Sequence, residues 1–268
     1  MKQKDYLRFA VTTSLRPSPE QVAAAKRLAA ELNTVFLERN NLSLKSLSRL
    51  FNVERLIVVS AQKVSCISPE GKEFFFHPSL AILRIKEIKD GKTDQMINAM
   101  SLGTGHSVLD CTLGLGTDAI VASYVTGSGG RVTGLESSPV ISALVRAGLS
   151  SYNKAGEDIA AAMRRITVIT TDYKEYLATL PPCCYDVVYF DPMFRLPGRK
   201  SPPVDAFRTL ANHAPVDRES VELALRAAVK RVVLKERRGS LEFERLGFKK
   251  IYGGKYSPVA YGVIDLKG

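Results

Sequence analysis

Two closely spaced glycines are the first residues of this chain whose spacing suits ligand binding. Gly114 and Gly116 lie within residues 110–118, directly after a short β-prone run. Glycine lets a backbone turn tightly and approach a ligand without a side chain in the way. The helix expected next would present its N-terminal amides to a carboxylate or phosphate. Glu136, 20 residues after Gly116, can accept both hydroxyls of a ribose. The spacing therefore predicts a nucleoside-binding loop.

An acidic residue before the glycines limits which nucleoside ligands the loop can bind favourably. The carboxylate of Asp110, four residues before Gly114, can compensate a positive sulfonium or ammonium group but would repel a pyrophosphate. The pattern Asp-x-x-x-Gly-x-Gly resembles the cofactor motif of methyltransferases. On this loop alone alternatives stay open, because Gly114-x-Gly116-x-x-Ala119 also satisfies the dinucleotide fingerprint of NAD enzymes, and a glycine turn can bind nothing.

A second motif, Asp191-Pro192-Met193-Phe194, follows an almost unbroken apolar run. An exocyclic amine on a base is a poor nucleophile because its lone pair is delocalised into the ring. The Asp191 carboxylate and the carbonyls flanking Pro192 can accept its N–H bonds and favour a tetrahedral nitrogen. Phe194 can stack on the base. Asp191, Pro192 and Phe194 are thus the candidate catalytic residues, against the alternative that Asp-Pro only begins a turn.

Further polar residues follow the expected strands. Asp172 can face the adenine amino group of a cofactor, or cap the helix after it, or do both. The loop 195–203 is rich in Pro, Gly and basic residues, and we expect it to contact substrate phosphates unless it is only a solvated loop. Its candidate substrate-binding residues are Arg195, Arg199 and Lys200. A second basic cluster, within 230–238, brackets the next strand.

Regular alternation of strands and helices begins near residue 105 and predicts an α/β fold with a mostly parallel sheet. The expected strands are 107–110, 131–135, 166–170, 185–190, 231–235, 248–252 and 259–266. The expected helices between them are 118–125, 139–149, 219–229 and 240–246. The last two strands are too close for a helical crossover, so we expect an antiparallel terminal hairpin. A seven-stranded sheet of this kind is the Rossmann-like architecture of class I methyltransferases, whereas a dehydrogenase would more often continue with parallel strands.

The first third of the chain predicts a smaller α+β domain. Ser18 and Gln21 form a capping box with proline at the first helical position. A strand is expected at 11–14, a second helix at 43–51, and further strands at 56–60, 63–67 and 73–76. A helix over 94–102 leads into the next unit. We therefore expect an N-terminal domain over 1–93, a candidate for substrate recruitment, and a cofactor-binding methyltransferase domain over 94–268.

The composition and net charge of the chain limit the classes of function that it can have. The chain is 45% hydrophobic and 24% charged, as expected of a globular protein, and no run of residues suits a membrane helix. The four cysteines have no zinc-binding spacing, so no metal is expected and a reducing, cytoplasmic location is favoured. The formal net charge of +11 favours polyanionic partners such as nucleic acid.

These motifs together resemble the family of SAM-dependent methyltransferases typified by the bacterial 16S ribosomal RNA guanine-N2 methyltransferase J. The resemblance rests on the Gly-Leu-Gly-x-Asp loop ending at Asp118, on Leu135-Glu136, and on the Asp-Pro-Met-Phe segment that begins at Asp191. It implies S-adenosyl-L-methionine (SAM) as cofactor. Segments such as Lys255-Tyr256-Ser257-Pro258 resemble an uncharacterised Gram-positive branch, and Thr117 replaces an arginine, so the target nucleotide does not follow from the resemblance.

The resemblance and the residues together define one set of cofactor-binding candidates. They are Asp110, Gly114, Gly116, Thr117, Asp118, Glu136, Ser137, Asp172 and Asp191. The hypothesis is a SAM-dependent enzyme that methylates an exocyclic base amine, guanine N2, in small-subunit ribosomal or other structured RNA. The alternatives are a small-molecule or protein methyltransferase, a non-catalytic nucleic-acid-binding module with the same fold and, least favoured, an NAD dehydrogenase.

Overall fold

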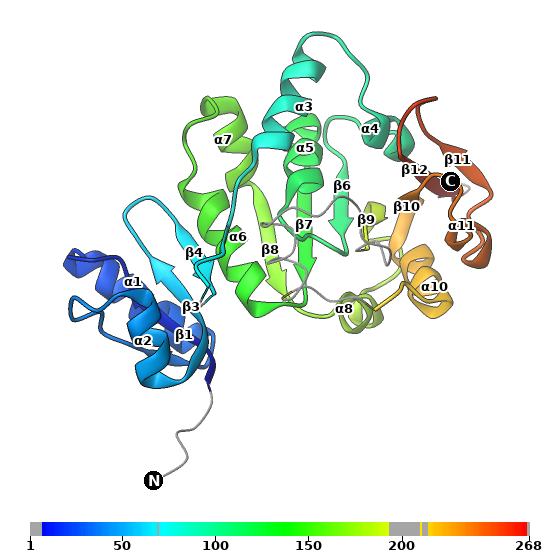
Figure 1. Ribbon diagram of the computed structural model, residues 1–268. Helices are drawn as coiled ribbons and strands as arrows, with labels where there is room; N and C mark the ends of the chain where they lie inside the picture. Colours follow the sequence, from blue (N-terminus) through cyan, green and yellow to red (C-terminus); the bar gives the residue numbers. More distant parts are fainter. Residues whose placement is uncertain (1–6, 69, 193–209, 211–213, 267–268) are drawn as a thin grey trace. The chain divides into compact units, whose positions relative to one another are not determined.

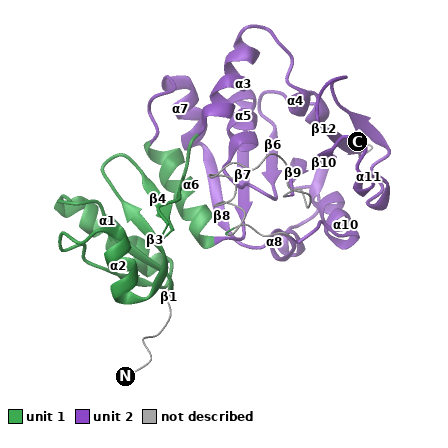
Figure 2. Cartoon of the chain, in the orientation of Figure 1, with its two compact units in different colours: residues 1–77, 139–151, 199–210 green, residues 78–138, 152–198, 211–268 purple. Residues whose placement is uncertain are grey.

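The computed structural model describes residues 7–68, 70–192, 210 and 214–266, and the described residues form two sheets (Figure 1). The chain divides into two compact units (Figure 2). The first contains the N-terminal residues through His77 together with α6 (Pro139–Ser151), and the second contains most of the remainder. The expected domain boundary after residue 93 stays a prediction. No helix within the described ranges is long and apolar enough to cross a membrane.

The first unit is built around a five-stranded sheet in the order β2-β1-β3-β4-β5. Its strands are β1 (Leu7–Thr13), β2 (Val35–Phe36), β3 (Val53–Val59), β4 (Val64–Ile67) and β5 (Glu73–Phe75). Its other helices are α1 (Pro19–Glu31) and α2 (Leu44–Phe51). The capping box is confirmed, because Ser18 Oγ accepts from the Gln21 amide and the Gln21 side chain accepts from the Ser18 amide. The paired strands expected at 56–67 are the antiparallel pair β3 and β4.

The second unit contains a seven-stranded sheet in the order β11-β12-β10-β9-β6-β7-β8. Its strands are β6 (Ser107–Asp110), β7 (Arg131–Glu136), β8 (Ile166–Thr170), β9 (Tyr185–Phe190), β10 (Ala228–Arg237), β11 (Lys250–Tyr252) and β12 (Val259–Asp265). Five neighbouring strands are parallel, and β12 runs antiparallel to both β10 and β11. The predicted α/β class I methyltransferase sheet and its terminal antiparallel hairpin are confirmed.

The second unit also contains helices that pack on the sheet or on one another. They are α3 (Ser79–Lys89), α4 (Gln95–Met100), α5 (Thr117–Thr126), α7 (Glu157–Arg164), α8 (Tyr173–Thr179), α10 (Arg218–Ala227) and α11 (Glu242–Arg245). Helix α5 packs on β6, β7 and β8, whereas α10 packs on β9 and β10. The helices α3 and α7 have no counterpart among the elements expected from the sequence. Leu80 and Leu83 of α3 are exposed, so its apolar residues do not form the one-sided stripe from which a helix is predicted.

Alternation along the strands separates the two faces of this sheet. Phe190 belongs to one buried cluster with Val221 and Ala224 of α10, whereas its neighbour Tyr189 donates to Asp118 of α5. Because successive side chains of a strand point to opposite faces, α5 and α10 cover opposite faces. Val232 and Leu234 of β10 share the α10 face with Phe190. The alternate positions of β9 and β10, including Lys235, therefore face α5.

Candidate cofactor and reaction site

The glycine loop lies between β6 and α5 and depends on backbone conformations that favour glycine. Gly114 has φ +51° and Gly116 has φ +73°, both in the left-handed region that L side chains rarely adopt. The Gly116 amide donates to the Leu113 carbonyl at 2.7 Å, which closes the turn, and α5 begins at Thr117. The loop therefore ends at the N-terminal amides of a helix, as the spacing predicted.

The loop is joined to the end of the neighbouring strand β7. The Gly114 amide donates to Oε2 of Glu136 at 3.1 Å, and the Ser138 amide donates to Oε1 at 2.8 Å. Gly134 of β7 lies so close to the loop that a Cβ there would come within 2.5 Å of Cδ1 of Leu113. Burial raises the pKa of Glu136 to about 7 although backbone amides oppose the shift.

Asp110 is the last residue of β6 and is almost fully buried, with 2% of its surface exposed. Its Oδ1 accepts the amide of Thr112 at 3.0 Å. Burial raises the pKa of Asp110 to about 8, further than this hydrogen bond lowers it. Neither Asp110 nor Glu136 forms an ion pair with any residue that the structure describes. Both are buried acids for which a cationic group or a hydroxyl donor would be a favourable partner.

Asp191 directly follows β9, so it lies at the same carboxyl-end edge of the sheet as Asp110. Its amide donates to Oγ1 of Thr112 at 2.6 Å, which ties the end of β9 to the start of the glycine loop. Its Oδ2 accepts from Nζ of Lys235 at 2.7 Å, and 28% of its side chain is exposed. Burial raises the pKa of Asp191 to about 6 in spite of the lysine.

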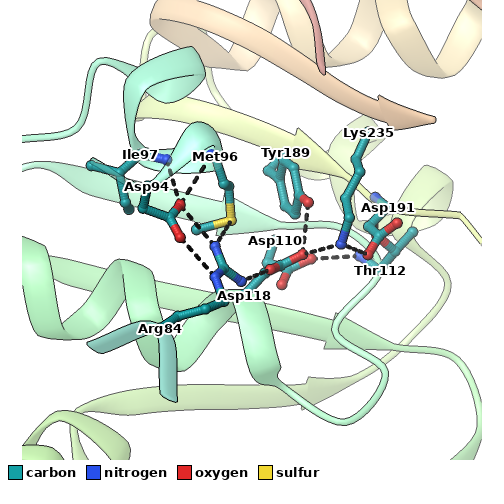
Figure 3. A network of polar contacts seen from close by, with 10 residues as sticks. All are labelled: Arg84, Asp94, Met96, Ile97, Asp110, Thr112, Asp118, Tyr189, Asp191 and Lys235. Carbon is teal, nitrogen blue, oxygen red and sulfur yellow. Dashed lines mark hydrogen bonds and ion pairs between the residues drawn. The ribbon is translucent and has the colours of Figure 1, made fainter. Parts of the chain in front are cut away.

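A chain of charged side chains continues from Asp191 into the α5 face (Figure 3). Nζ of Lys235 also donates to Oδ2 of Asp118 at 2.9 Å, and the Tyr189 hydroxyl donates to the same oxygen at 2.7 Å. Arg84 donates to Oδ1 of Asp118, and its Nε and Nη2 donate to Asp94 at 2.8 and 2.9 Å. We refer to this set as the ion-pair chain, which consists of Arg84, Asp94, Asp118, Tyr189, Lys235 and Asp191.

The two bases dominate the electrostatics of Asp118. Burial by itself would raise its pKa, but Lys235 and Arg84 overcome that effect and hold the pKa below its ordinary value. Burial likewise works against the charge of Lys235, whose pKa is nevertheless raised because Asp118 and Asp191 face it. The lysine is therefore a permanent ammonium at neutral pH. The ion-pair chain holds two bases and three carboxylates, so it is not charge-balanced.

The remaining cofactor candidates differ in how the structure uses them. Both carboxylate oxygens of Asp118 accept hydrogen bonds inside the ion-pair chain, so its predicted cofactor contact stays a prediction. Asp172 caps α8, since its Oδ1 accepts the Lys174 amide at 2.8 Å; its contact with adenine stays a prediction. Thr117 begins α5 and Ser137 follows β7, both at the same edge of the sheet.

Several predicted residues fall outside the described part of the chain. They are the catalytic candidate Phe194 and the substrate-binding candidates Arg195, Arg199 and Lys200. Pro192 is described and directly follows Asp191. Within the described ranges, no group of three His, Cys, Asp or Glu side chains is placed to hold a metal ion.

The site also contains Lys235, Tyr189 and Thr112, which the sequence motifs do not indicate as site residues. The sequence places Lys235 in the basic cluster within 230–238, whereas in the structure it lies in the ion-pair chain with 18% of its side chain exposed. Tyr189 was counted only as part of an apolar strand, and Thr112 was not singled out. A signal was present, because Tyr189 and Lys235 are polar-ended side chains at alternate positions of strands whose other positions are purely apolar.

The arrangement fits a nucleoside cofactor that carries positive charge. Glu136 can accept ribose hydroxyls where it already fixes the loop, and Asp110 can face a cationic group. The negative excess of the ion-pair chain favours the same charge. A pyrophosphate would meet buried acids at this edge, which argues against a dinucleotide.

Comparison with known proteins identifies the family. Residues 75–246 match a family model described as "Putative SAM-dependent methyltransferase". The chain is 41% identical, over 95% of its length and 98% of the relative's, to the uncharacterised protein YpiP of Bacillus subtilis. It is 30% identical, over 82% of its length and 86% of the relative's, to ribosomal RNA small subunit methyltransferase J of Nitrosococcus oceani. The match to the protein of that name from Hydrogenovibrio crunogenus, at 32% identity, covers only 55% of the relative.

A solved structure shows the same fold. A SAM-dependent methyltransferase of Neisseria gonorrhoeae superposes with a TM-score of 0.62 at 19% identity, and the match covers 95% of this chain and 94% of that one. The sheet order, the cofactor loop between β6 and α5 and the family match agree with one another. The chain belongs to the SAM-dependent methyltransferase family, and its cofactor is S-adenosyl-L-methionine.

Proposed function

We propose that this enzyme methylates an exocyclic amino group of a base, guanine N2, in small-subunit ribosomal RNA. The observation that carries the proposal is the position of Asp191 and Pro192. They follow β9 at the edge of the sheet where Asp110 and Glu136 lie, and Thr112 links Asp191 directly to the glycine loop. An acceptor at this point can orient a weakly nucleophilic amine toward the bound cofactor.

The chemistry divides between cofactor and protein. Bound SAM supplies an electrophilic methyl group. Asp191 is proposed to accept an N–H of the amine and so make its lone pair available, and a carboxylate does this better than a neutral acid because it is acceptor-only. Lys235 occupies Oδ2 of Asp191, so the proposal places the amine at Oδ1. The Pro192 carbonyl and Phe194 complete the proposed reaction centre, as acceptor and stacking surface.

Two observations support RNA as the substrate. Two relatives are named ribosomal RNA small subunit methyltransferase J: one matches over 82% of this chain and 86% of its own length, and the other over 56% of this chain and 55% of its own length. The net charge of +11 favours a polyanion. The sequence assigns phosphate contacts to Arg195, Arg199 and Lys200, and it assigns substrate recruitment to residues 1–93. Both assignments are part of the proposal.

The test is to map methylated nucleotides in ribosomal RNA from a strain that lacks the gene. The lost methylation should return with the wild-type gene and not with Asp191→Ala. A gene carrying Asp158→Ala, a change at an exposed carboxylate outside the site, is the matched control and should restore it. An unchanged methylation pattern in the deletion strain would refute the RNA assignment.

A second experiment separates RNA from a small-molecule or protein substrate. Purified enzyme is incubated with methyl-labelled SAM and deproteinised small-subunit RNA, and Arg199→Ala/Lys200→Ala is compared with wild type. The proposal expects a higher KM for RNA and a weaker salt dependence in the double variant, because fewer phosphates are neutralised. Equal KM values and equal salt dependence would contradict the phosphate contacts. Absence of S-adenosylhomocysteine (SAH) binding would instead support a non-catalytic module.

A further inference from the structure

Lys235 lies in the ion-pair chain beside the proposed acceptor rather than on the protein surface. Its ammonium does not face solvent as a phosphate-binding group would. Nζ lies 2.7 Å from Oδ2 of Asp191 and 2.9 Å from Oδ2 of Asp118, and 18% of the side chain is exposed. The lysine thus bridges the proposed acceptor of the substrate amine and a carboxylate at the start of α5.

The other end of this bridge is fixed. Asp118 is 7% exposed, and besides Lys235 it accepts from the Tyr189 hydroxyl and from Arg84. Arg84 is held in turn by two hydrogen bonds to Asp94, whose Oδ1 also caps α4. Each of these donors and acceptors is buried or partly buried, so few alternative positions are open to the Lys235 ammonium.

Burial works against the charge of this ammonium, so its contacts with the two carboxylates have to offset a desolvation cost. Asp118 also accepts from Arg84, which it shares with Asp94, and from the Tyr189 hydroxyl. Asp191 is partly exposed and could be solvated without a partner. Both carboxylates gain from the lysine, since Lys235 also lowers the pKa of Asp118. For Asp191, the adjacent cation favours the ionised form and a second anchor limits the rotation of the carboxylate.

We propose that Lys235 is a positioning residue, which keeps Asp191 ionised and in one orientation so that its second oxygen accepts the N–H of the target amine. Asp118 and Arg84 act one step further away, by holding the Lys235 ammonium in place. This assigns Asp118 a different role from the cofactor contact that the sequence predicts. The identity of the amine in this inference rests on the proposed function. The effect of Lys235 on Asp191 does not depend on it.

Lys235 is not a proton acceptor in this scheme. Asp118 and Asp191 raise its pKa against the effect of burial, so it carries its proton throughout the neutral range. The charged and titratable groups that act on Asp191 come from every neighbouring element. They are Lys235 on β10, Asp118 on α5, Asp110 on β6 and Tyr189 on β9, with Tyr261 on β12, Arg84 on α3 and Asp94 before α4 acting through Lys235 and Asp118.

The first experiment measures Asp191 directly, without RNA. Protein labelled with ¹³C at the aspartate carboxyl carbons is titrated by NMR, and the Asp191 signal is the one absent from Asp191→Asn. In Lys235→Met the titration midpoint of Asp191 should rise by about 1 pH unit or more, because an opposite charge within hydrogen-bonding distance is removed. Lys235→Arg, which keeps the charge, should retain most of the wild-type value.

Lys230→Met is the matched control, since it removes a lysine of the same strand that pairs with Asp186 rather than with the site. It should leave the Asp191 midpoint unchanged. An unchanged midpoint in Lys235→Met would overturn the proposal. Should that variant not fold, the wild-type protein still decides, because a midpoint above about 8 would mean that Lys235 does not keep Asp191 ionised at neutral pH.

The second experiment measures methyl transfer. Lys235→Met should lower kcat on small-subunit RNA by about 100-fold, leave the Kd for SAH within about threefold, and move the acidic limb of the pH–rate profile to higher pH. The kcat of Lys235→Arg should be at least about tenfold higher than that of Lys235→Met. An equal loss in both variants, with an unshifted pH profile, would mean that the lysine is only structural. Failure of wild-type enzyme to methylate RNA would refute the proposed function and leave the NMR result standing.

Discussion

The amide of Gly114 donates a hydrogen bond to Oε2 of Glu136 at 3.1 Å. This bond links the glycine loop before α5 to the end of the neighbouring strand β7, so one carboxylate both shapes the loop and faces the place proposed for the ribose. Glu136 serves as an acceptor most strongly when it is ionised. Burial raises its pKa to about 7, so its charge state changes within the physiological range.

The first prediction is a pH-dependent affinity for SAH. A carboxyl group with a pKa of about 7 is mostly protonated near pH 6 and mostly ionised near pH 8, so binding should tighten by up to about tenfold over that range. Calorimetric titration at both pH values measures it. Glu136→Gln should bind more weakly and lose the part of the dependence that Glu136 causes, whereas Glu157→Gln, at an exposed carboxylate of α7, should behave as wild type. Equal pH dependence in wild type and Glu136→Gln would contradict the role of Glu136.

The second prediction concerns stability and Asp110. Its pKa of about 8 in the folded protein lies above its ordinary value, so the folded state keeps a proton that the unfolded state releases. Its contribution to the free energy of unfolding is therefore largest at low pH and declines as pH rises toward about 8. Asp110→Asn removes this decline, and Asn can still accept the Thr112 amide. In urea unfolding, the free energy of unfolding of the variant, relative to that of wild type, should increase between about pH 5 and 8. The increase should be at most about 1.4 kcal/mol per pH unit.

Asp158→Asn provides the contrast for that measurement. The exposed Asp158 carboxylate has a lowered pKa, first because of its hydrogen bond from Lys89. A carboxylate with a lowered pKa stabilises the fold at pH values above its ordinary pKa, and this stabilisation stays constant as the pH rises further. The difference between Asp158→Asn and wild type should therefore stay level over the range in which Asp110→Asn gains. If the difference in the free energy of unfolding between Asp110→Asn and wild type also stays constant over this range, Asp110 is ionised in the folded protein.

The third prediction is that Arg84→Met destabilises the protein strongly. It would leave Asp94 and Asp118 without their shared base in a site where Arg84 is 15% exposed. Breaking a buried pair from one side costs about 3–5 kcal/mol. Arg146→Met removes an arginine that pairs with Glu31, with both side chains about half exposed, and should cost less than about 1 kcal/mol. Chemical denaturation followed by circular dichroism compares the two, and similar losses would argue against the ion-pair chain as a stabilising element.

The fourth prediction tests the close packing of the cofactor loop on β7. In Gly134→Ala the new Cβ would lie 2.5 Å from Cδ1 of Leu113, so the loop or the strand has to shift. We expect a loss of about 1–3 kcal/mol in the free energy of unfolding and a weaker Kd for SAH. Gly129→Ala, whose Cβ would meet its nearest neighbour at 3.8 Å, should change neither. Wild-type affinity for SAH in Gly134→Ala would show that the loop does not depend on this contact.

Much of the second unit could be predicted because its signals are local. The expected strands 107–110, 166–170 and 185–190 coincide with β6, β8 and β9, since short apolar runs bounded by turn residues mark buried parallel strands. The hairpin at the end of the chain followed from the short distance between its strands. The helices α3 and α7 could not be predicted in this way: Leu80 and Leu83 of α3 are exposed, and α7 is short and rich in alanine.

The sequence by itself determined which residues could do chemistry, because motifs such as Asp191-Pro192 and the loop ending at Asp118 are continuous in the chain. Only the tertiary structure decided which of them meet. Lys235 lies 44 residues from Asp191 and 117 from Asp118, and it reaches both because β10 pairs with β9 and because its side chain falls on the α5 face. Strand order and the face to which a side chain points are non-local properties. A lysine that the sequence groups with other basic residues is therefore partly buried beside the proposed acceptor in the structure.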